Sequence, residues 1–333
     1  MALGNILSVI ILNWNGAKLL RKFLPSVIAN TQGQEVEVIV ADNGSTDNSL
    51  EVLCNEFPNV KILTFDENLG FSGGYNRAIS EVESEFVILL NSDVETPPGW
   101  WQPLLSFMNA HPGVGACQPK ILSYYRKDKF EYAGAAGGLL DKYGYPFCRG
   151  RLFDQIEYDF CQYDTGPEDI AWASGAALMV RREVYLDAGG LDELFFAHME
   201  EIDLCCRIHN LGYRVCVVPE SSVYHLGGAT LSQGNPKKTY LNFRNNLLLL
   251  HKNLPQEKGK KVLFKRRLMD MLAFFMYVAK FDFANANAIL KAHNDFRKMR
   301  GNYRVFPDAD VLSTLPGADR CIVLDRYLPF LTK

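Results

Sequence analysis

The stretch Val87-Ile88-Leu89-Leu90-Asn91-Ser92-Asp93-Val94-Glu95 decides the fold of this chain. Its first four residues are apolar and include no turn former, which favours a strand buried on both faces. Two carboxylates, Asp93 and Glu95, follow within a few residues. In open α/β sheets the ends of such strands form the binding edge. The stretch therefore predicts either a ligand or metal site or, on a plainer interpretation, a solvated strand exit.

The first ninety residues repeat this pattern of short apolar runs separated by helix-length segments. The predicted strands cover residues 7–12, 36–41, 60–65 and 86–90. Such alternation predicts right-handed βαβ crossovers, a parallel sheet and an α/β fold class. Polar side chains follow every strand at the same end, where they line one crevice: Asn13, Asn15, Asp42, Asn43, Ser45, Asp66, Asn68, Asn91 and Asp93.

A glycine-rich loop at residues 68–77 follows the third predicted strand. Its glycines allow a close approach of backbone to ligand, and N–H groups that open a helix attract phosphate. A dinucleotide-binding fingerprint would follow the first strand instead, which argues against a dehydrogenase. The alternative is a turn whose glycines only bring a helix close to the sheet.

Four motifs in this order and spacing resemble glycosyltransferase family 2, on the branch of rhamnosyltransferase-like enzymes. They occupy residues 9–15 (VIILNWN), 40–47 (VADNGSTD), 68–71 (NLGF) and 90–93 (LNSD). Residues 200–207 (EEIDLCCR) are similar to the acidic helix of the family, and residues 223–225 (VYH) resemble its strand exit with a metal-ligand His. The resemblance extends from about Leu7 to about Pro255.

The resemblance implies a GT-A fold, with a central, mostly parallel sheet flanked by helices, and a set of donor and metal ligands. Asp42 would contact the pyrimidine base, and Asp93 with His225 would hold Mg²⁺ or Mn²⁺ against the diphosphate, whose charge a hard cation neutralises. Where many members have D-x-D, this chain has Asn91-Ser92-Asp93, so the first position offers only an amide oxygen. The implied donor-binding residues are Asn13, Asn15, Asp42, Asn68, Gly70, Asn76, Asn91 and Arg244.

Arg244 opens a helix after the polar loop 226–238, which in the resemblance closes over the diphosphate. A guanidinium pairs with two phosphate oxygens, which suits that role. An ordinary surface Arg is the alternative.

The acidic helix start at Glu200 supplies the catalytic candidates. Inverting transfer needs a base that takes the proton of the acceptor hydroxyl. Matched to the family, Glu201 is the base and Glu200 its structural partner, with Asp203 as the alternative register. Glu201, Cys205 and His209 share one helix face and could also hold a soft metal, although no second ligand pair completes a zinc site.

The apolar run 172–180 predicts a strand where the acceptor half meets the donor half. Its small residues Ser174 and Gly175 leave room for a sugar ring, and Trp172 could stack on one. These three residues are the predicted acceptor contacts, and close packing is the alternative.

Composition is consistent with this interpretation. The 333 residues carry a formal charge of −3, which argues against a nucleic-acid-binding protein, and 48% of them are hydrophobic. We expect a catalytic domain over residues 1–254, with a donor half of about 1–95 and an acceptor half of about 96–254, and a C-terminal helical extension over 255–333. Eight cysteines without a disulfide framework and the lack of a signal peptide predict a cytoplasmic protein.

The extension begins with a basic cluster between Lys258 and Arg267 and continues with an aromatic-rich segment, 268–283. Such a segment can lie on an anionic membrane at the inner face of the plasma membrane, or it can pack on the catalytic domain.

The sequence thus predicts an inverting, metal-dependent glycosyltransferase of cell-surface polysaccharide synthesis. The expected donor is dTDP-rhamnose or a UDP-sugar, and the expected acceptor is a glycan or a lipid-linked glycan. The rival interpretations are a nucleotidyltransferase and a nucleotide-sugar-binding or scaffold protein without catalysis.

Overall fold

The computed structural model describes residues 6–227, 234–303 and 306–327. All four strands predicted for the N-terminal part are present, and β1 and β4 are buried over nearly their whole length. Their Val, Ile and Leu side chains face covered surfaces on both sides, as expected for parallel strands in an α/β protein. The strands are β1 (Leu7–Asn13), β2 (Val36–Asn43), β3 (Lys61–Phe65) and β4 (Phe86–Asn91).

These strands form the parallel side of a nine-stranded sheet in the described part of the chain, with the order β11-β13-β6-β12-β4-β1-β2-β3. The other side is mixed, since β12 runs antiparallel to both of its neighbours. Its strands are β5 (Val94–Glu95), β6 (Val114–Ser123), β11 (Glu168–Asp169), β12 (Ala177–Arg181) and β13 (Arg214–His225). Strand β5 pairs with β13. The mostly parallel sheet that the sequence predicts is confirmed.

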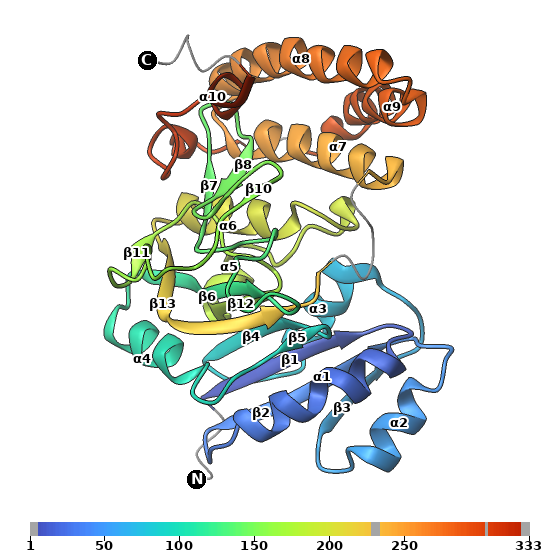
Figure 1. The fold of residues 1–333 in the computed structure, drawn as a ribbon, viewed down its shortest axis with the longest axis vertical. Helices are drawn as coiled ribbons and strands as arrows, with labels where there is room; N and C mark the ends of the chain where they lie inside the picture. The colour runs from blue at the N-terminus through green and yellow to red at the C-terminus, as the bar shows by residue number, and fades with distance from the viewer. Residues whose placement is uncertain (1–5, 228–233, 304–305, 328–333) are drawn as a thin grey trace.

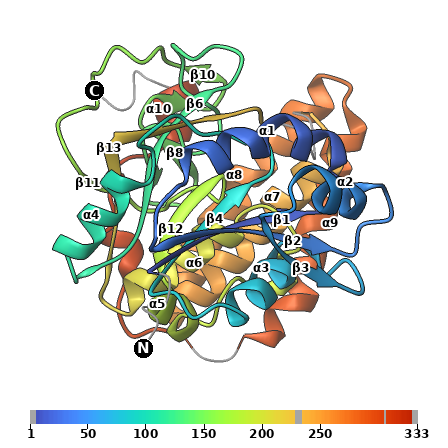
Figure 2. The same cartoon turned by 90° about the horizontal axis from the view of Figure 1, so that it is seen from below.

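Helices cover both faces of the sheet, as the view from below in Figure 2 shows. One face packs against α1 (Ala17–Asn30), α2 (Ser49–Glu56) and α4 (Gln102–Ala110). The other packs against α3 (Gly70–Ser80), α5 (Arg182–Asp187) and α6 (Glu200–Asn210).

A small second sheet and a helical layer complete the molecule above the main sheet in Figure 1. The small sheet contains β7 (Gly138–Leu140), β8 (Pro146–Cys148), β9 (Arg151–Leu152) and β10 (Gln155–Ile156). The helical layer contains α7 (Pro236–Asn253), α8 (Gln256–Ala279), α9 (Phe283–Met299) and α10 (Ile322–Tyr327). Short 3₁₀ turns lie at Glu193–Phe195, Arg300–Asn302 and Val311–Ser313.

Buried polar side chains fix α8 onto the rest of the molecule. Arg266 and Asp270 pair at 3.3 Å, and both are buried. The Asp270 carboxylate also accepts a hydrogen bond from the Tyr145 hydroxyl at 3.0 Å and lies 3.0 Å from His293 Nε2 on α9. The apolar cluster beneath α7 and α8 is continuous with the core of the main sheet. The division at residue 254 stays a prediction. Among the described residues, no helix is both long and apolar enough to cross a bilayer.

Candidate active site

The exits of β1 and β2 are joined by hydrogen bonds among the predicted donor residues. The strand register pairs Asn13 with Asp42, and Asn13 Nδ2 donates to Asp42 Oδ1 at 2.9 Å. Asp42 Oδ2 accepts the backbone N–H of Ser45 at 3.0 Å. Asn15 lies in the left-handed region at φ 51°, and its amide oxygen accepts the N–H groups of Thr46 and Asp47. This network holds the Asp42 carboxylate in one orientation.

The exit of β3 is connected to the same network through Asn43. Its amide donates to Asn68 Oδ1 and to the carbonyl of Gly70, both at 3.0 Å, and accepts the N–H of Leu69. Sequence analysis noted Asn43 but did not include it among the donor residues. Its position shows that a polar side chain following β2 organises the loop after β3.

The glycine-rich loop opens α3, and its glycines have two separate effects. Gly70 has φ +73°, a conformation that glycine adopts without strain, and the Asn68 side chain accepts its N–H at 2.8 Å. A Cβ on Gly74 would lie 2.6 Å from the Leu12 side chain, so this glycine allows α3 to approach β1 closely. The close-packing alternative therefore describes Gly74, while the exposed helix start at Gly70 faces the crevice edge.

Asn76 does not lie with the donor residues. Its amide donates to the carbonyl of Leu191 at 2.8 Å and accepts from the Tyr185 hydroxyl and from the Leu191 N–H. These bonds join α3 to the segment after α5. These bonds occupy the polar atoms of Asn76, and its predicted donor contact stays a prediction.

Asn91, Asp93 and His225 meet at the end of β4, as the resemblance implied. The antiparallel pairing of β5 with β13 sets His225 opposite Val94, and His225 Nε2 lies 3.1 Å from Asp93 Oδ1. Asn91 Nδ2 lies 3.4 Å from the same nitrogen. Asp93 and His225 are both buried. Two residues 132 positions apart in the sequence thus share one small polar site.

Glu131 completes this cluster from the other side of the imidazole. Its Oε2 lies 3.3 Å from His225 Nδ1. Burial by itself lowers the pKa of His225, but the contacts with Asp93 and Glu131 outweigh burial and raise that pKa to about 10. The contact with His225 also lowers the pKa of Glu131 against the opposing effect of its own burial. A carboxylate behind a metal-ligating His orients the ring and increases its basicity.

The acidic start of α6 has three carboxylates in different surroundings. Asp203 is fully buried and paired with Arg207 at 2.8 Å, with Lys252 at 3.0 Å and with Asn253 at 2.7 Å. Burial, with a further contribution from the Glu201 carboxylate, raises the pKa of Glu200 well above its usual value. Burial raises the pKa of Glu201 to about 7. Of these three carboxylates, Asp203 is the one held by cationic partners.

Glu201 combines burial with a free oxygen. Its Oε2 is buried and has no hydrogen-bond partner among the described residues. A Cβ on Gly175 would lie 3.7 Å from Glu201 and 3.6 Å from Phe71 at the start of α3. Gly175 therefore separates the acidic helix from the donor-side helix without filling the space between them.

The segment before Glu200 has a strained backbone. Phe196, His198 and Met199 all have positive φ values, of 67°, 67° and 73°. Such conformations cost a non-glycine residue about 1–3 kcal/mol each and persist only where neighbouring groups hold them. The amide of Asn245, on α7, donates to the carbonyls of Phe195, Ala197 and His198 at 2.9, 2.9 and 2.7 Å.

Arg244 takes part in the same connection, and its predicted contact with phosphate stays a prediction. Its Nη2 donates to the carbonyls of Leu194 and Phe195 at 3.1 and 2.9 Å, and its side chain is buried. The surface Arg of the alternative interpretation is not found. Part of the loop expected to close over the diphosphate, residues 228–233, lies outside the described residues.

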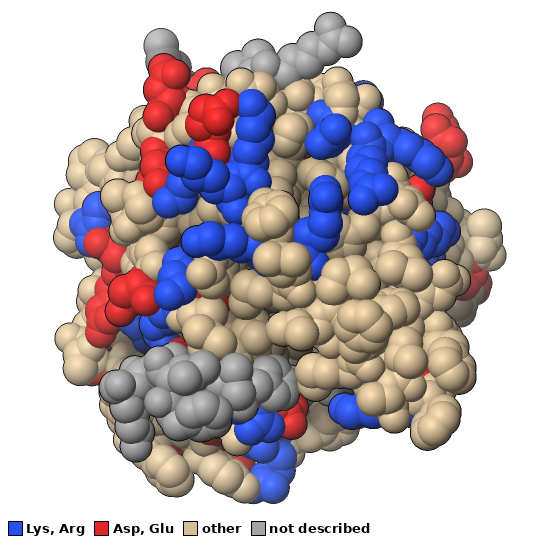
Figure 3. Space-filling view, turned by 90° about the horizontal axis from the view of Figure 1, so that it is seen from above, with Lys and Arg blue, Asp and Glu red and all other residues tan. Residues whose placement is uncertain are grey.

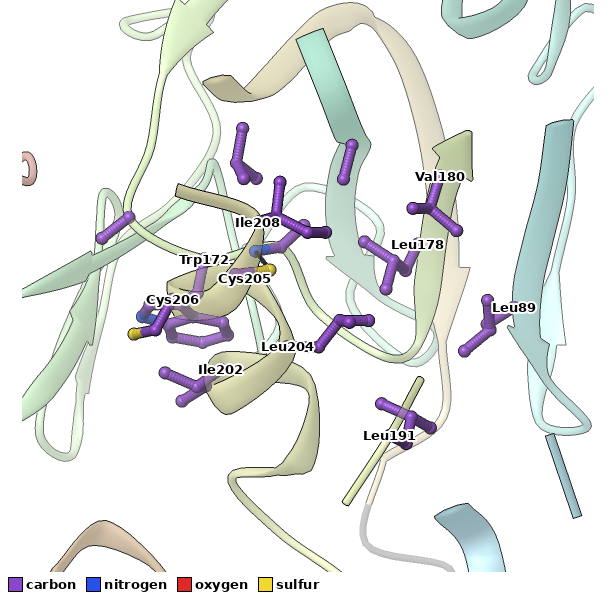
Figure 4. Close-up of a cluster of buried hydrophobic side chains, with 14 of the residues drawn as sticks. Leu89, Trp172, Leu178, Val180, Leu191, Ile202, Leu204, Cys205, Cys206 and Ile208 are labelled. Atoms are coloured by element: carbon purple, nitrogen blue, oxygen red, sulfur yellow. Dashed lines mark hydrogen bonds between the residues drawn. The ribbon is translucent and has the colours of Figure 1, made fainter. Parts of the chain in front are cut away.

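Trp172 and Ser174 are buried in the core, and their predicted acceptor contacts stay predictions. Trp172 is 4% exposed, and its indole N–H donates to the carbonyl of Leu139 at 3.0 Å. Figure 4 shows its ring beside Ile202 and Cys206 of α6. The Ser174 hydroxyl donates to the carbonyl of Ala133 at 2.9 Å. Of the three predicted acceptor residues, only Gly175 faces the space beside Glu201.

The shared helix face of Glu201, Cys205 and His209 is explained by packing. Cys205 Sγ accepts the backbone N–H of Ala173 at 3.4 Å, and His209 Nε2 lies 3.2 Å from the carbonyl of Ala171. Within the described residues, no group of three or more His, Cys, Asp or Glu side chains is arranged to hold a metal ion. Any cation at Asp93 and His225 therefore needs further ligands from a bound molecule or from water.

Sequence reasoning missed Glu131 and gave no role to Asn245. Glu131 lies in an irregular segment without a motif, and only its position across from His225 in space identifies it. Asn245 follows Arg244 directly, so the pair could have been recognised as a polar interruption in an otherwise apolar helix face.

The fold and the arrangement of the site define a GT-A glycosyltransferase. The family model described as Glycosyl transferase family 2 matches residues 8–186, which is more than half of the chain. The chain therefore belongs to glycosyltransferase family 2.

Curated relatives support this assignment. An N-acetylglucosaminyl-diphospho-decaprenol L-rhamnosyltransferase of Mycobacterium tuberculosis is 30% identical over 236 residues, which cover 66% of this chain and 76% of the relative. The O-antigen biosynthesis protein RfbC of Myxococcus xanthus is 26% identical over 228 residues, which cover 67% of this chain and 17% of that protein.

Solved structures share the fold at low identity. GalNAc-T7 with UDP, GalNAc and Mn²⁺ superimposes with a TM-score of 0.60 at 16% identity, covering 90% of this chain and 57% of that one. S. aureus TarS 1–349 in complex with UDP-GlcNAc gives a TM-score of 0.57 at 18% identity, with 87% and 80% covered.

Proposed function

We propose that this protein is an inverting, metal-dependent glycosyltransferase that moves a sugar from a nucleoside-diphosphate donor to a lipid-linked glycan in cell-surface polysaccharide synthesis. The proposed donor is dTDP-rhamnose or a UDP-sugar. Family membership and the printed activity of the mycobacterial relative support this choice. The relative acts on a sugar attached to a diphospho-lipid, and the proposed acceptor has the same chemical class.

The placement of Glu201 is the observation that carries the proposal. A base for inverting transfer needs an unoccupied carboxylate oxygen next to space for the acceptor hydroxyl, and a pKa near the working pH. Glu201 Oε2 is buried without a partner among the described residues, Gly175 places no side chain against Glu201, and burial raises the pKa of the carboxyl to about 7. Asp203, the alternative base, has its oxygens occupied by Arg207, Lys252 and Asn253.

The donor-side cluster is suited to a divalent cation. Asp93 supplies a carboxylate and His225 an imidazole nitrogen, 3.1 Å apart, and Glu131 lies behind the ring. Two protein ligands leave coordination positions for diphosphate oxygens, the usual arrangement for a cation bound together with its substrate. When bound, the cation neutralises charge on the departing nucleoside diphosphate. Asp93, His225 and the Asn91 amide are the residues that would hold it.

The remaining residues bind and orient the donor in this proposal. Asp42 accepts the ring N–H of uracil or thymine, and Asn13 and Ser45 hold its carboxylate in place. The N–H of Gly70 is bonded to Asn68, so the backbone N–H groups that follow it in the first turn of α3 would contact the diphosphate. Glu201 then takes the proton from the acceptor hydroxyl as that oxygen attacks the anomeric carbon from the face opposite the leaving group.

The test is turnover with a panel of donors and an N-acetylglucosaminyl-diphospho-lipid of short chain length. We expect release of nucleoside diphosphate that depends on both acceptor and Mg²⁺ or Mn²⁺, with dTDP-rhamnose or a UDP-sugar as the best donor. NMR of the product should show an anomeric configuration inverted relative to the donor. Donor binding without turnover on any acceptor would instead identify a nucleotide-sugar-binding protein.

A further inference from the structure

One side of α8 exposes large apolar side chains at helical spacing. Phe264, Leu268 and Leu272 recur every four residues, and Phe275 and Met276 continue the row. Phe281 and Phe283 extend it into the turn before α9. We call these seven residues the apolar stripe. These residues are between 40% and 82% exposed. A contiguous apolar surface of this kind is unusual for a monomer.

The packing of α8 explains why the stripe remains uncovered. The helix packs against the rest of the molecule with a different face, which contains Gly259, Val262, Arg266 and Asp270. Arg266 and Asp270 are committed to the buried contacts with Tyr145 and His293. Packing on the catalytic domain, one of the two roles expected from the sequence, therefore explains one face of α8. It leaves the apolar stripe without a partner in the described structure.

Cations lie next to the stripe. Segment 258–280 has five Lys and two Arg against a single acid, Asp270, which is buried. Lys261, Lys265 and Arg267 are exposed between or beside stripe residues. Figure 3 views this face of the molecule, where Lys and Arg side chains gather along one part and an adjoining broad area carries almost no charge.

We propose that the apolar stripe and its flanking cations dock this protein on the surface of an anionic lipid bilayer. Apolar side chains would enter the interface between headgroups and acyl chains, while Lys and Arg pair with lipid phosphates. No described helix is suited to span a membrane, so the contact is peripheral. The inference rests on the proposed function only in that a lipid-linked acceptor resides in such a bilayer.

A second copy of the chain is a poorer occupant of this surface. A symmetric dimer joins the same patch of both copies, which would set the exposed Lys261, Lys265 and Arg267 of one copy against those of the other, since the nearby acids Glu257 and Asp310 already pair with Lys260 and Lys258. An anionic bilayer has the complementary charge.

The test is co-sedimentation of the whole chain with vesicles of phosphatidylcholine, with and without 30% phosphatidylglycerol. We expect binding to the anionic vesicles that falls when salt rises from about 50 mM to about 500 mM, since exposed charges are then screened. The double variant Leu268→Gln/Leu272→Gln should lower the partition coefficient at least about tenfold. Both side chains are more than half exposed, so the fold should survive. Leu186→Gln/Leu211→Gln, exposed elsewhere, is the matched control.

Lys261→Glu/Lys265→Glu should reduce anionic binding similarly, and Lys18→Glu/Lys22→Glu on α1 should not. Equal sedimentation of wild type and the Leu268/Leu272 variant, or no sedimentation, would overturn the proposal. A dimer detected by analytical ultracentrifugation and lost in that variant would assign the stripe to a second copy. Because no arm measures sugar transfer, failure here leaves the proposed function standing.

Discussion

At the scale of single residues, we expect Glu201 to control the pH dependence of the reaction. Its carboxyl must be ionised to accept a proton, and burial raises its pKa to about 7. We therefore expect kcat to fall as pH decreases through about 7, because the protonated acid cannot act as a base. Glu201→Gln should slow transfer by about 10²- to 10⁴-fold and abolish this acid limb, while calorimetric affinity for the donor is retained.

Glu220→Gln, at an exposed position within β13, is the charge-matched control, and it should leave rate and pH profile unchanged. A Glu201→Gln enzyme with near-normal turnover would remove Glu201 from the reaction. Asp203→Asn is no substitute for this test, since it disturbs the buried pairs with Arg207 and Lys252 and so reports on folding.

Asp93 should determine metal-dependent binding of the nucleoside diphosphate. Asp93→Ala removes the carboxylate beside His225, and calorimetry with UDP or dTDP plus Mn²⁺ should then show no gain from the metal. Glu131→Gln should weaken Mn²⁺ affinity by about 10- to 100-fold, as expected for a group that orients a ligand. Asp154→Ala, on an exposed side chain, is the control. Unchanged metal dependence in Asp93→Ala would move the cation elsewhere.

At the scale of elements, α7 positions the start of α6. Asn245 binds three carbonyls of the strained segment before Glu200, so its loss should let that backbone relax and displace Glu201. We expect Asn245→Ala to lower kcat at least about tenfold with little change in donor KM and to shift the acid limb of the pH profile.

Asn246→Ala is the matched control for this prediction. Asn246 is also buried on α7, but its amide contacts the carbonyl of Gly144 and the guanidinium of Arg266. Neither of these groups belongs to the segment before Glu200. Both variants should lose stability in urea titrations. Equal effects of the two variants on kcat would show that Asn245 acts only through stability.

The same contrast between local and distant contacts explains what the sequence could predict. The strands β1 to β4 follow from apolar runs, because a parallel strand buried on both faces has that pattern whatever packs on it. The meeting of Asp93 and His225 followed from the resemblance. The contacts of Trp172, Ser174 and Arg244 could not be predicted, because their partners, the carbonyls of Leu139, Ala133 and Leu194, are 33 to 50 positions away along the chain.

At the scale of the whole molecule, the C-terminal helices and the catalytic part share one apolar cluster and the buried Arg266–Asp270 pair. We therefore expect one cooperative unfolding transition. Removing one partner of a buried pair leaves an uncompensated charge, so Asp270→Ala should cost about 3–5 kcal/mol of unfolding free energy. Asp154→Ala, which breaks the exposed pair with Arg326, should cause no measurable loss.

The positions of the tryptophans make this cooperativity measurable. All four, Trp14, Trp100, Trp101 and Trp172, lie before residue 254, so their fluorescence reports on the catalytic part, whereas far-UV circular dichroism also reports on α8 and α9. Coincident urea transitions for the two probes, shifted together by Asp270→Ala, are expected for one folding unit. An early loss of helical signal without a change in fluorescence would show instead that 255–333 unfolds by itself, and would support the division at residue 254 that the sequence predicts.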